Sequence, residues 1–311
     1  RDFREIKMET VEKNSAKAWV LAARPKTLAA AVVPVLVGSA LSVFLGDGAA
    51  FDWRKFTICF LFASLMQIAA NLINDLFDFL KGSDGKDRLG PERAMAQGWI
   101  TKNAMYVGIA IVVGLAAVCG LMMLPIIEEA QVTTMIGVGI FCIFFAYFYT
   151  SGPFPLSYNG LGDVAVVGFF GVVATCFTCY CQSPGCFSDP RCIVAGVATG
   201  LAINALLVVN NYRDRETDAA DGKRTLIVKF GERFGEQLYL WCGLGAVVMM
   251  CYVFRDNLPL ALFYIPYIIL HLMSYVKLVR IKRGKALNQL IGESSRNMMV
   301  FAIATVVAMM M

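Results

Sequence analysis

Residues 190–218 read PRCIVAGVATGLAINALLVVNNYRDRETD, and the two halves of this stretch differ sharply in character. The run at 192–210 has no charged side chain, whereas five of the next eight residues, 211–218, are charged. A helix of roughly 20 apolar residues crosses the hydrocarbon core of a bilayer, which is about 30 Å thick. The stretch therefore predicts a transmembrane helix that ends in a polar, charged segment.

The composition extends this prediction to the whole chain. Of the 311 residues, 58% are hydrophobic and only 16% are charged, whereas soluble chains have about 45–50% and about 25%. This excludes a disordered chain, a coiled coil and a disulfide-stapled secreted scaffold. We predict an all-α polytopic membrane protein with about nine transmembrane helices, at 27–45, 56–73, 104–124, 132–150, 163–181, 192–210, 237–254, 259–276 and 297–311.

The basic residues indicate an orientation. The segments that would lie on one side of the membrane hold 23 Lys and Arg residues, and those on the other side hold Arg54, Lys55, Arg191 and Arg255. Because cytoplasmic segments carry the basic excess, we expect a cytoplasmic N-terminus and an external C-terminus. Residues 1–26 are too charged for a cleavable signal peptide and are expected to lie on the membrane surface, before a single transmembrane domain at 27–311.

The net charge of +5 comes with no basic stripe, so we do not expect the protein to bind nucleic acid. We expect it to contact the lipid bilayer, and the sequence indicates no obligate protein partner. Most of the ten cysteines lie inside apolar runs, where cysteine acts as a small apolar residue. A disulfide among Cys181, Cys186 and Cys192 stays open, since these residues follow one another around one outer connection. His271 lies in the middle of an apolar run and is expected to be a buried, hydrogen-bonded helix residue.

Two charged clusters, each attached to an apolar run, share a layout. The first begins at Asn71 and the second at Asn210, and in both an amide pair precedes carboxylates, basic residues and glycines. Asp75 and Asp78 are spaced i, i+3, and Asp214 and Asp218 are spaced i, i+4, so each pair shares one face of a helix. By the predicted topology both clusters end at the cytoplasmic mouth. An isolated charge run is usually a solvated loop, but two matching clusters at one membrane face favour a binding site.

Stacked carboxylates repel one another and require a cation. Mg²⁺ binds oxygen ligands and prefers one or two carboxylates together with substrate phosphates. Neighbouring Lys and Arg side chains would hold the other phosphate oxygens. The clusters therefore predict a site for a diphosphate bridged by Mg²⁺.

These residues, in this order, resemble the UbiA-type intramembrane prenyltransferases, and among them the branch that prenylates dihydroxynaphthoate in menaquinone biosynthesis. The resemblance covers nearly the whole chain. Besides the two clusters it rests on Arg24-Pro25-Lys26-Thr27, Arg88-Leu89-Gly90-Pro91, Tyr149-Thr150-Ser151-Gly152-Pro153, Gly160-Leu161-Gly162-Asp163 and Gly222-Lys223-Arg224-Thr225-Leu226. It implies a helical bundle around a central cavity, with Mg²⁺ as cofactor and polyprenyl diphosphate and 1,4-dihydroxy-2-naphthoate as substrates. It also implies a location in the inner membrane of a bacterial cell.

The resemblance also implies roles for individual residues. The expected metal ligands are Asn74, Asp75, Asp78, Asp84, Asp214 and Asp218. Asp78, Asp214 and Asp218 are the expected catalytic residues, and the general base is an Asp of either cluster. The expected substrate-binding residues are Asn71, Asn74, Lys81, Arg88, Arg93, Asn211, Arg213 and Lys223. Related quinone enzymes often carry a basic residue between the fourth and fifth spans, but residues 147–163 contain none.

The implied reaction forms an allylic cation, which aromatic faces stabilise. We expect these from the aromatic run Phe144, Phe145, Tyr147, Phe148 and Tyr149. Two other enzymatic or transport functions stay open. A sister prenyltransferase of the phylloquinone or ubiquinone branch would share the Asp clusters and differ in its aromatic pocket. A cation-coupled transporter would place its site near the membrane midplane rather than at one face.

Overall fold

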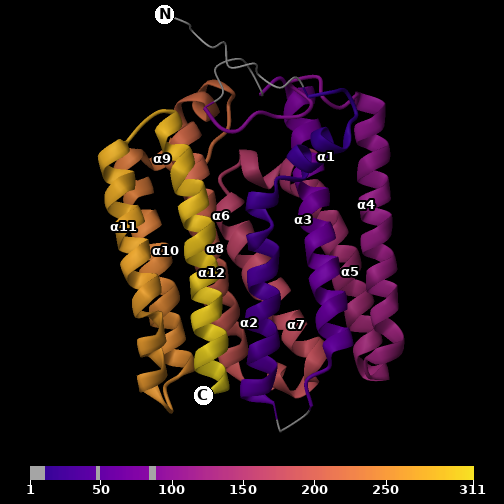
Figure 1. Ribbon diagram of the computed structural model, residues 1–311, viewed down its shortest axis with the longest axis vertical. Coiled ribbons are helices and arrows are strands. Elements are labelled where there is room, and N and C mark those ends of the chain that lie inside the picture. The colour runs from indigo at the N-terminus through magenta and orange to yellow at the C-terminus, as the bar shows by residue number, and fades with distance from the viewer. Residues whose placement is uncertain (1–10, 47–49, 84–88) are drawn as a thin grey trace, which may run out of the picture.

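The computed structural model describes residues 11–46, 50–83 and 89–311, and throughout these ranges the regular elements are helices (Figure 1). Most long helices are continuous, but one span is built from three consecutive pieces, α6 (Gly162–Val166), the π-helix η4 (Val167–Val173) and α7 (Ala174–Gln182). The continuous long helices are α2 (Ala29–Leu45), α3 (Trp53–Lys81), α4 (Lys102–Met123), α5 (Glu129–Thr150), α8 (Pro190–Ala220), α10 (Glu232–Val253), α11 (Ile265–Ile281) and α12 (Asn288–Met310). The short elements used below are α1 (Ala16–Ala23), η1 (Pro25–Thr27), η3 (Leu156–Tyr158), η5 (Pro184–Ser188) and α9 (Leu226–Phe230).

The predicted membrane spans agree with these helices. Within the described residues, seven helices are long and apolar enough to cross a membrane, and an eighth span arises if α1 and η1 are joined to α2 across a 49° bend. The ninth predicted span is α12, which has 23 residues and packs against α2, α8 and α11. The all-α membrane fold is therefore confirmed, and nine is an approximate count of its spans.

Helix α8 forms the centre of the bundle. Its most apolar window is 72% buried, whereas the corresponding windows of α4 and α5 are only 11% buried. Helix α8 packs against α10, η4, α12 and α2, while α4 and α5 lie at one edge of the molecule (Figure 1). The apolar outer faces of α4 and α5 are left for lipid. In the charged half of α8, Arg213, Arg215 and Asp218 are also buried.

Helices α3 and α8 continue well past their apolar runs. Helix α3 has 29 residues and α8 has 31, so the amides and first carboxylates of each cluster, from Asn71 to Asp78 and from Asn210 to Asp218, lie in the last turns of long helices. Gly82, with φ of 76°, ends α3 in the left-handed conformation that glycine adopts without strain. At the opposite ends of the two helices, Asp52 and Asp189 cap the N-termini. Arg54 donates to Asp52 and lowers the pKa of this carboxyl to about 2.

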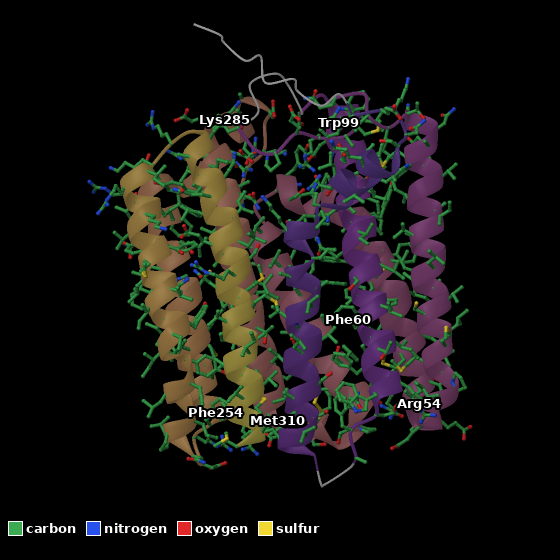
Figure 2. All side chains as sticks on the ribbon, viewed as in Figure 1. Arg54, Phe60, Trp99, Phe254, Lys285 and Met310 are labelled. Carbon is green, nitrogen blue, oxygen red and sulfur yellow. A yellow bond between two sulfur atoms is a disulfide. The ribbon has the colours of Figure 1, made fainter. Side chains whose placement is uncertain are left out.

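The two ends of the bundle differ in character (Figure 2). Trp99 and Lys285 mark the end that also holds the last turns of α3 and α8, which we call the polar end. Arg54, Phe254 and Met310 mark the opposite end, which we call the far end.

His271 lies in the core as expected. It is 1% exposed, its Nε2 lies 3.0 Å from the Tyr239 backbone oxygen, and its ring stacks on the Tyr239 ring with 4.6 Å between centroids. Gly243 on the facing α10 makes this packing possible, because a Cβ there would lie 2.2 Å from His271 Nε2. The prediction of a buried, hydrogen-bonded histidine is confirmed.

Candidate active site

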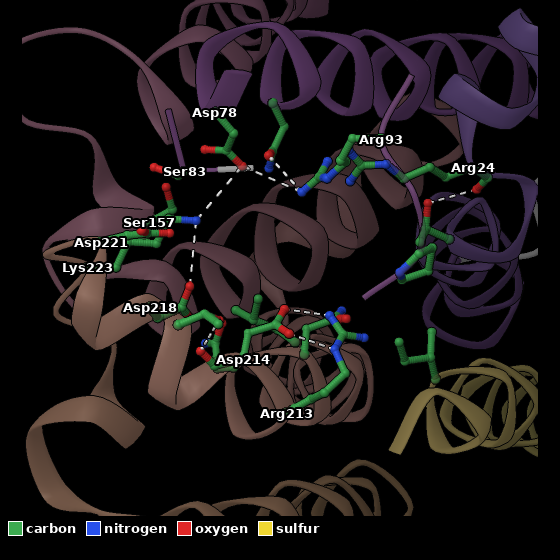
Figure 3. Close-up of a pocket in the computed structure, with 18 of the residues that line it drawn as sticks. Arg24, Asp78, Ser83, Arg93, Ser157, Arg213, Asp214, Asp218, Asp221 and Lys223 are labelled. Carbon is green, nitrogen blue, oxygen red and sulfur yellow. Dashed lines mark hydrogen bonds and ion pairs between the residues drawn. The ribbon is translucent and has the colours of Figure 1, made fainter. Parts of the chain in front are cut away.

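A cavity of about 580 Å³ opens at the polar end, and we call it the polar chamber. The last turns of α3 and α8 face each other across it (Figure 3). Its acidic lining residues are Asp78, Glu92, Asp214, Asp218 and Asp221, and its basic lining residues are Arg24, Lys26, Arg93, Arg213 and Lys223. The two charged clusters, far apart in the sequence, thus form one site.

Lys223 joins the two clusters. Its Nζ lies 3.9 Å from Asp78 Oδ2 and 3.6 Å from Asp218 Oδ1. Asp78 is 2% exposed and Asp218 is 8% exposed. Burial of two carboxylates is costly without a cation, so the position between them is one that strongly favours positive charge.

Asp78 is fixed by residues from two other segments. Tyr158 in η3 donates its hydroxyl proton to Asp78 Oδ1 at 2.8 Å, and Ser83 Oγ lies 3.0 Å from the same hydroxyl oxygen. Arg93 Nη2 lies 3.5 Å from Asp78 Oδ2 and 3.4 Å from Asn74 Oδ1. The oxygens of Asn74 and Asp78, one turn apart on α3, therefore converge on the cavity.

Asp214 has a partner within its own motif. Arg213 donates to both of its carboxylate oxygens, from Nε at 2.7 Å and from Nη2 at 2.5 Å. Arg213 Nη1 also donates to Asn288 Oδ1 at 2.9 Å, and Asn288 donates to the Leu89 backbone oxygen. Arg213 is only 3% exposed, and its hydrogen bond to Asn288 connects α8 to the start of α12.

Two expected site residues hold the scaffold instead. Asp75 is 1% exposed, and it accepts from the backbone N–H of Ala94 at 3.0 Å and of Met95 at 3.4 Å. Asn71 donates to the Ala23 backbone oxygen at 2.9 Å and to Thr27 Oγ1 at 3.1 Å. Asp75 positions the segment that carries Arg93, and Asn71 positions the break between α1 and α2. Their assignments as metal ligand and substrate-binding residue stay predictions that this geometry does not favour.

The remaining expected residues fall into three groups. Asn211 lines the polar chamber. Lys81 donates to the Thr150 backbone oxygen at 2.7 Å and lies 4.0 Å from the centroid of the Tyr158 ring, so it supports the wall of the site. Asp84 and Arg88 lie outside the described residues.

A second cavity of about 280 Å³ extends from the polar chamber into the bundle, and we call it the apolar chamber. Side chains of α2, α3, α5, α7, α8 and η4 line it. Six residues border both chambers, namely Arg24, Thr27, Asn74, Tyr149, Leu207 and Asn210. The two cavities therefore meet beside Asn74.

Two residues of the predicted aromatic run of five are placed where they could meet a substrate. Phe145 and Tyr149 line the apolar chamber, and Phe145 stacks on Phe169 of η4. Phe144, Tyr147 and Phe148 are 57%, 41% and 40% exposed on the outer face of α5. These three do not line the chamber because a helix directs a consecutive run of side chains to all sides, and only residues about one turn apart share a face.

Several residues of the site were absent from the predicted set. Arg24 and Lys26 line the polar chamber, and Tyr158 holds Asp78. Arg24 ends α1 with φ of 52°, a left-handed conformation that is uncommon for a residue other than glycine. Arg24 and Lys26 lie in one of the fragments that carry the family resemblance, which was the available signal. Tyr158 had none, since a lone tyrosine in a connection has no distinguishing pattern.

Known proteins match both the sequence and the fold. The model of the UbiA prenyltransferase family matches residues 31–309. This chain belongs to that family. It is 35% identical over 239 residues to the 1,4-dihydroxy-2-naphthoate octaprenyltransferase of Haemophilus influenzae, which covers 76% of each chain. The corresponding enzyme of Escherichia coli is 35% identical over 236 residues, covering 75% of each chain.

Solved structures share the fold. A UbiA homolog from Archaeoglobus fulgidus bound to GPP and Mg²⁺ superposes with a TM-score of 0.62 at 16% identity, over 94% of this chain and all of the other. The apo structure of a UbiA homolog from Aeropyrum pernix gives a TM-score of 0.67 at 10% identity, over 90% and 97% of the two chains. At these identities the likeness concerns the fold, and this chain is an integral membrane protein of the same architecture.

Proposed function

We propose that the protein transfers a polyprenyl group from polyprenyl diphosphate to 1,4-dihydroxy-2-naphthoate, in the menaquinone branch of the family. The single observation that carries the proposal is the polar chamber, in which two carboxylate clusters meet around a position that favours a cation. The adjoining apolar chamber suits a prenyl chain. The naphthoate octaprenyltransferases among its relatives support the choice of acceptor.

The donor set of the polar chamber fits a divalent cation. Asn74 and Asp78 on α3 and Asp214 and Asp218 on α8 offer hard oxygen ligands on facing helices, which is the ligand chemistry of Mg²⁺. We propose these four residues as the metal ligands. Mg²⁺ bound there would offset the charge of the diphosphate and so stabilise it as a leaving group. The structure of the Archaeoglobus fulgidus homolog bound to GPP and Mg²⁺ supports the choice of metal.

The basic residues would hold the diphosphate from several sides. Arg93 and Lys223 already lie beside Asp78, and Arg24 and Lys26 enter from the break before α2. Guanidinium groups bind phosphate oxygens in a bidentate manner, and preorganised charges of this kind stabilise negative charge as it develops on a leaving group. These residues supply the cationic role for which residues 147–163 offer no side chain.

With the diphosphate in the polar chamber and the prenyl chain in the apolar chamber, the allylic carbon would lie near Asn74, where the chambers meet. The allylic C–O bond breaks and the diphosphate leaves with the electron pair. The ring carbon of the naphthoate that carries the carboxylate then bonds to the allylic carbon. The bond between that carbon and the carboxylate breaks, CO₂ leaves, and the electron pair of the broken bond restores the aromatic ring. Phe145 and Tyr149 face this region and would stabilise the positive charge by cation–π contact while they exclude water.

The proposal is tested with purified protein, Mg²⁺, prenyl diphosphates of several lengths, and naphthoate labelled at the carboxyl carbon. The label should leave as CO₂ in proportion to prenylated product, and 4-hydroxybenzoate should be a poor acceptor. A pocket that holds two fused rings would hold a single ring loosely and lose the near-attack geometry. Efficient prenylation of 4-hydroxybenzoate with its carboxylate retained would assign the protein to the ubiquinone branch instead.

The metal site is tested by a matched pair of variants on one helix. Asp78→Asn removes a proposed ligand at the polar end of α3, and Asp52→Asn changes a capping residue at its far end. Turnover should fall by at least about two orders of magnitude in Asp78→Asn, since removal of a preorganised electrostatic group costs several kcal/mol. Asp52→Asn should be nearly unchanged. Full wild-type activity in excess EDTA would contradict the proposal.

A further inference from the structure

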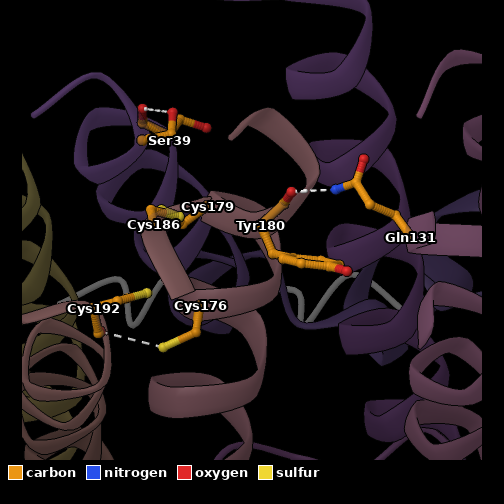
Figure 4. The surroundings of a disulfide bond; sticks show 8 residues. Ser39, Gln131, Cys176, Cys179, Tyr180, Cys186 and Cys192 are labelled. Carbon is orange, nitrogen blue, oxygen red and sulfur yellow. Dashed lines mark hydrogen bonds between the residues drawn. A yellow bond between two sulfur atoms is a disulfide. The ribbon is translucent and has the colours of Figure 1, made fainter. Parts of the chain in front are cut away.

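Four cysteines gather at the far end of the bundle, at the end opposite the polar chamber (Figure 4). Cys176 and Cys179 lie on α7, Cys186 lies in η5, and Cys192 lies in the first turn of α8. Each is at most 1% exposed. Three segments that follow one another in the chain thus bury their thiols in one place.

The sulfur atoms are within reach of one another. Cys179 and Cys186 form a disulfide, which differs from the pairings considered from the sequence because one member is Cys179. The sulfur atoms of Cys179, Cys186 and Cys192 all lie within 4.8 Å of one another. Cys192 is therefore a free thiol placed directly beside a disulfide.

The position of Cys192 favours its reactive form. It is the third residue of α8, a helix of 31 residues, and the N-terminus of a helix stabilises an anion such as a thiolate. Asp189, the nearby acid, is occupied by three hydrogen bonds from the Arg191 guanidinium. Cys176 Sγ donates to the backbone oxygen of Cys192 at 3.3 Å and so helps to fix this turn.

We propose that Cys179, Cys186 and Cys192 form an intramolecular thiol–disulfide exchange site. The Cys192 thiolate attacks Cys186 Sγ, a new Cys186–Cys192 bond forms, and the Cys179–Cys186 bond breaks. Cys179 leaves as a thiolate and takes up the proton that Cys192 gave up. One disulfide is lost and one is gained, so the step needs no external oxidant or reductant.

The exchange changes which helix is tied to η5. In one state Cys186 is bonded to α7, and in the other it is bonded to α8. Helix α7 also forms part of the apolar chamber through its other face, which carries Phe177, Thr178 and Cys181. The cysteine pairing at the far end is therefore linked to the chamber wall through a single helix.

Cys181 provides an internal control, since sequence spacing alone would favour it. It is five residues from Cys186, whereas Cys192 is six residues away. The structure directs its sulfur elsewhere, 3.7 Å from Met135 Sδ. Only the tertiary arrangement selects Cys192 over Cys181 as a partner of Cys186.

The test maps disulfides in purified full-length protein. Oxidised samples are unfolded in acid to stop exchange, free thiols are alkylated, and linked peptides are identified by mass spectrometry. Wild-type molecules should divide between Cys179–Cys186 and Cys186–Cys192, whereas Cys192→Ser should carry only the first pair. Cys179→Ser should link Cys186 to Cys192 and leave Cys181 alkylated, and Cys181→Ser should match the wild type.

Two results would overturn the proposal. One is wild-type protein that carries only the Cys179–Cys186 pair after prolonged incubation at neutral pH, and this measurement needs no variant to fold. The other is purified protein with one zinc ion per chain whose removal by a chelator exposes all three thiols. That result would make the cluster a metal site and not an exchange site.

Discussion

At the residue scale, the Tyr158 hydroxyl holds the Asp78 carboxylate in position, and its removal should show how much this contributes to activity. Tyr158→Phe removes the hydroxyl that donates to Asp78 Oδ1 at 2.8 Å but keeps the ring beside Lys81. A hydrogen bond to a charged group contributes about 1.5–3 kcal/mol, so we expect kcat/KM to fall roughly 10- to 100-fold. Steady-state kinetics with the prenyl diphosphate varied would measure this. Tyr106→Phe, on the exposed face of α4, should leave the kinetics unchanged.

Substitutions at Asp75 and Asp78 should change different properties of the protein, although the two residues lie one turn apart. Asp75 is held by the backbone N–H groups of Ala94 and Met95, so Asp75→Asn should lower the free energy of unfolding by about 1–3 kcal/mol. Asp78→Asn should abolish turnover with a small change in melting temperature. Thermal unfolding in detergent and a Mg²⁺ titration of activity separate the two effects. Loss of Mg²⁺ affinity without loss of stability in Asp75→Asn would restore Asp75 as a metal ligand.

At the scale of elements, the contact between α8 and the π-helix η4 sets the wall of the apolar chamber. The two backbones approach closely at Gly171 and Gly200, and a Cβ on Gly200 would lie 2.6 Å from the Val167 backbone oxygen. Such an approach is possible only for glycine, since the contacting atoms are backbone. Phe169 and Phe170 of the same π-helix line the chamber, so any shift of η4 reaches the site.

Gly200→Ala should therefore affect both stability and activity. Overpacking of a close contact costs about 1–3 kcal/mol, and the displaced η4 would narrow the chamber. Melting temperature in detergent and kcat with a long prenyl diphosphate measure the two effects. Gly168→Ala is the matched control in η4, since a Cβ there meets nothing within 4 Å. Equal behaviour of the two variants would refute this role of the close contact.

For the whole molecule, the separation of the polar and far ends gives a prediction of membrane orientation. We propose that the polar end faces the cytoplasm, because the basic connections are concentrated there. A reporter inserted after Gly222 should read as cytoplasmic, and reporters near Ser188 or after Met311 should read as external. The opposite pattern would invert the proposed orientation. A surface location for residues 1–26, as distinct from the transmembrane domain, stays a prediction.

The sequence by itself determined the membrane class, the approximate spans and the pairing of the two charged clusters. Each of these depends on local pattern. An uncharged run such as 192–210 must be a helix in lipid because every backbone polar group has to be satisfied within the segment. The i, i+4 spacing of Asp214 and Asp218 likewise follows from helix geometry alone.

The tertiary structure decided which members of each pattern serve the site. Asp75 and Asp78 are aspartates of the same cluster, yet Asp75 accepts a hydrogen bond from the backbone N–H of Ala94 whereas Asp78 faces the polar chamber. Tyr158 and Arg24 reach the site from connections that carry no periodic signal. Cys186 pairs with Cys179 and lies beside Cys192, while Cys181 faces away. Side-chain direction depends on how helices rotate and pack against one another, and that packing joins residues whose separation in the sequence carries no information about their contact.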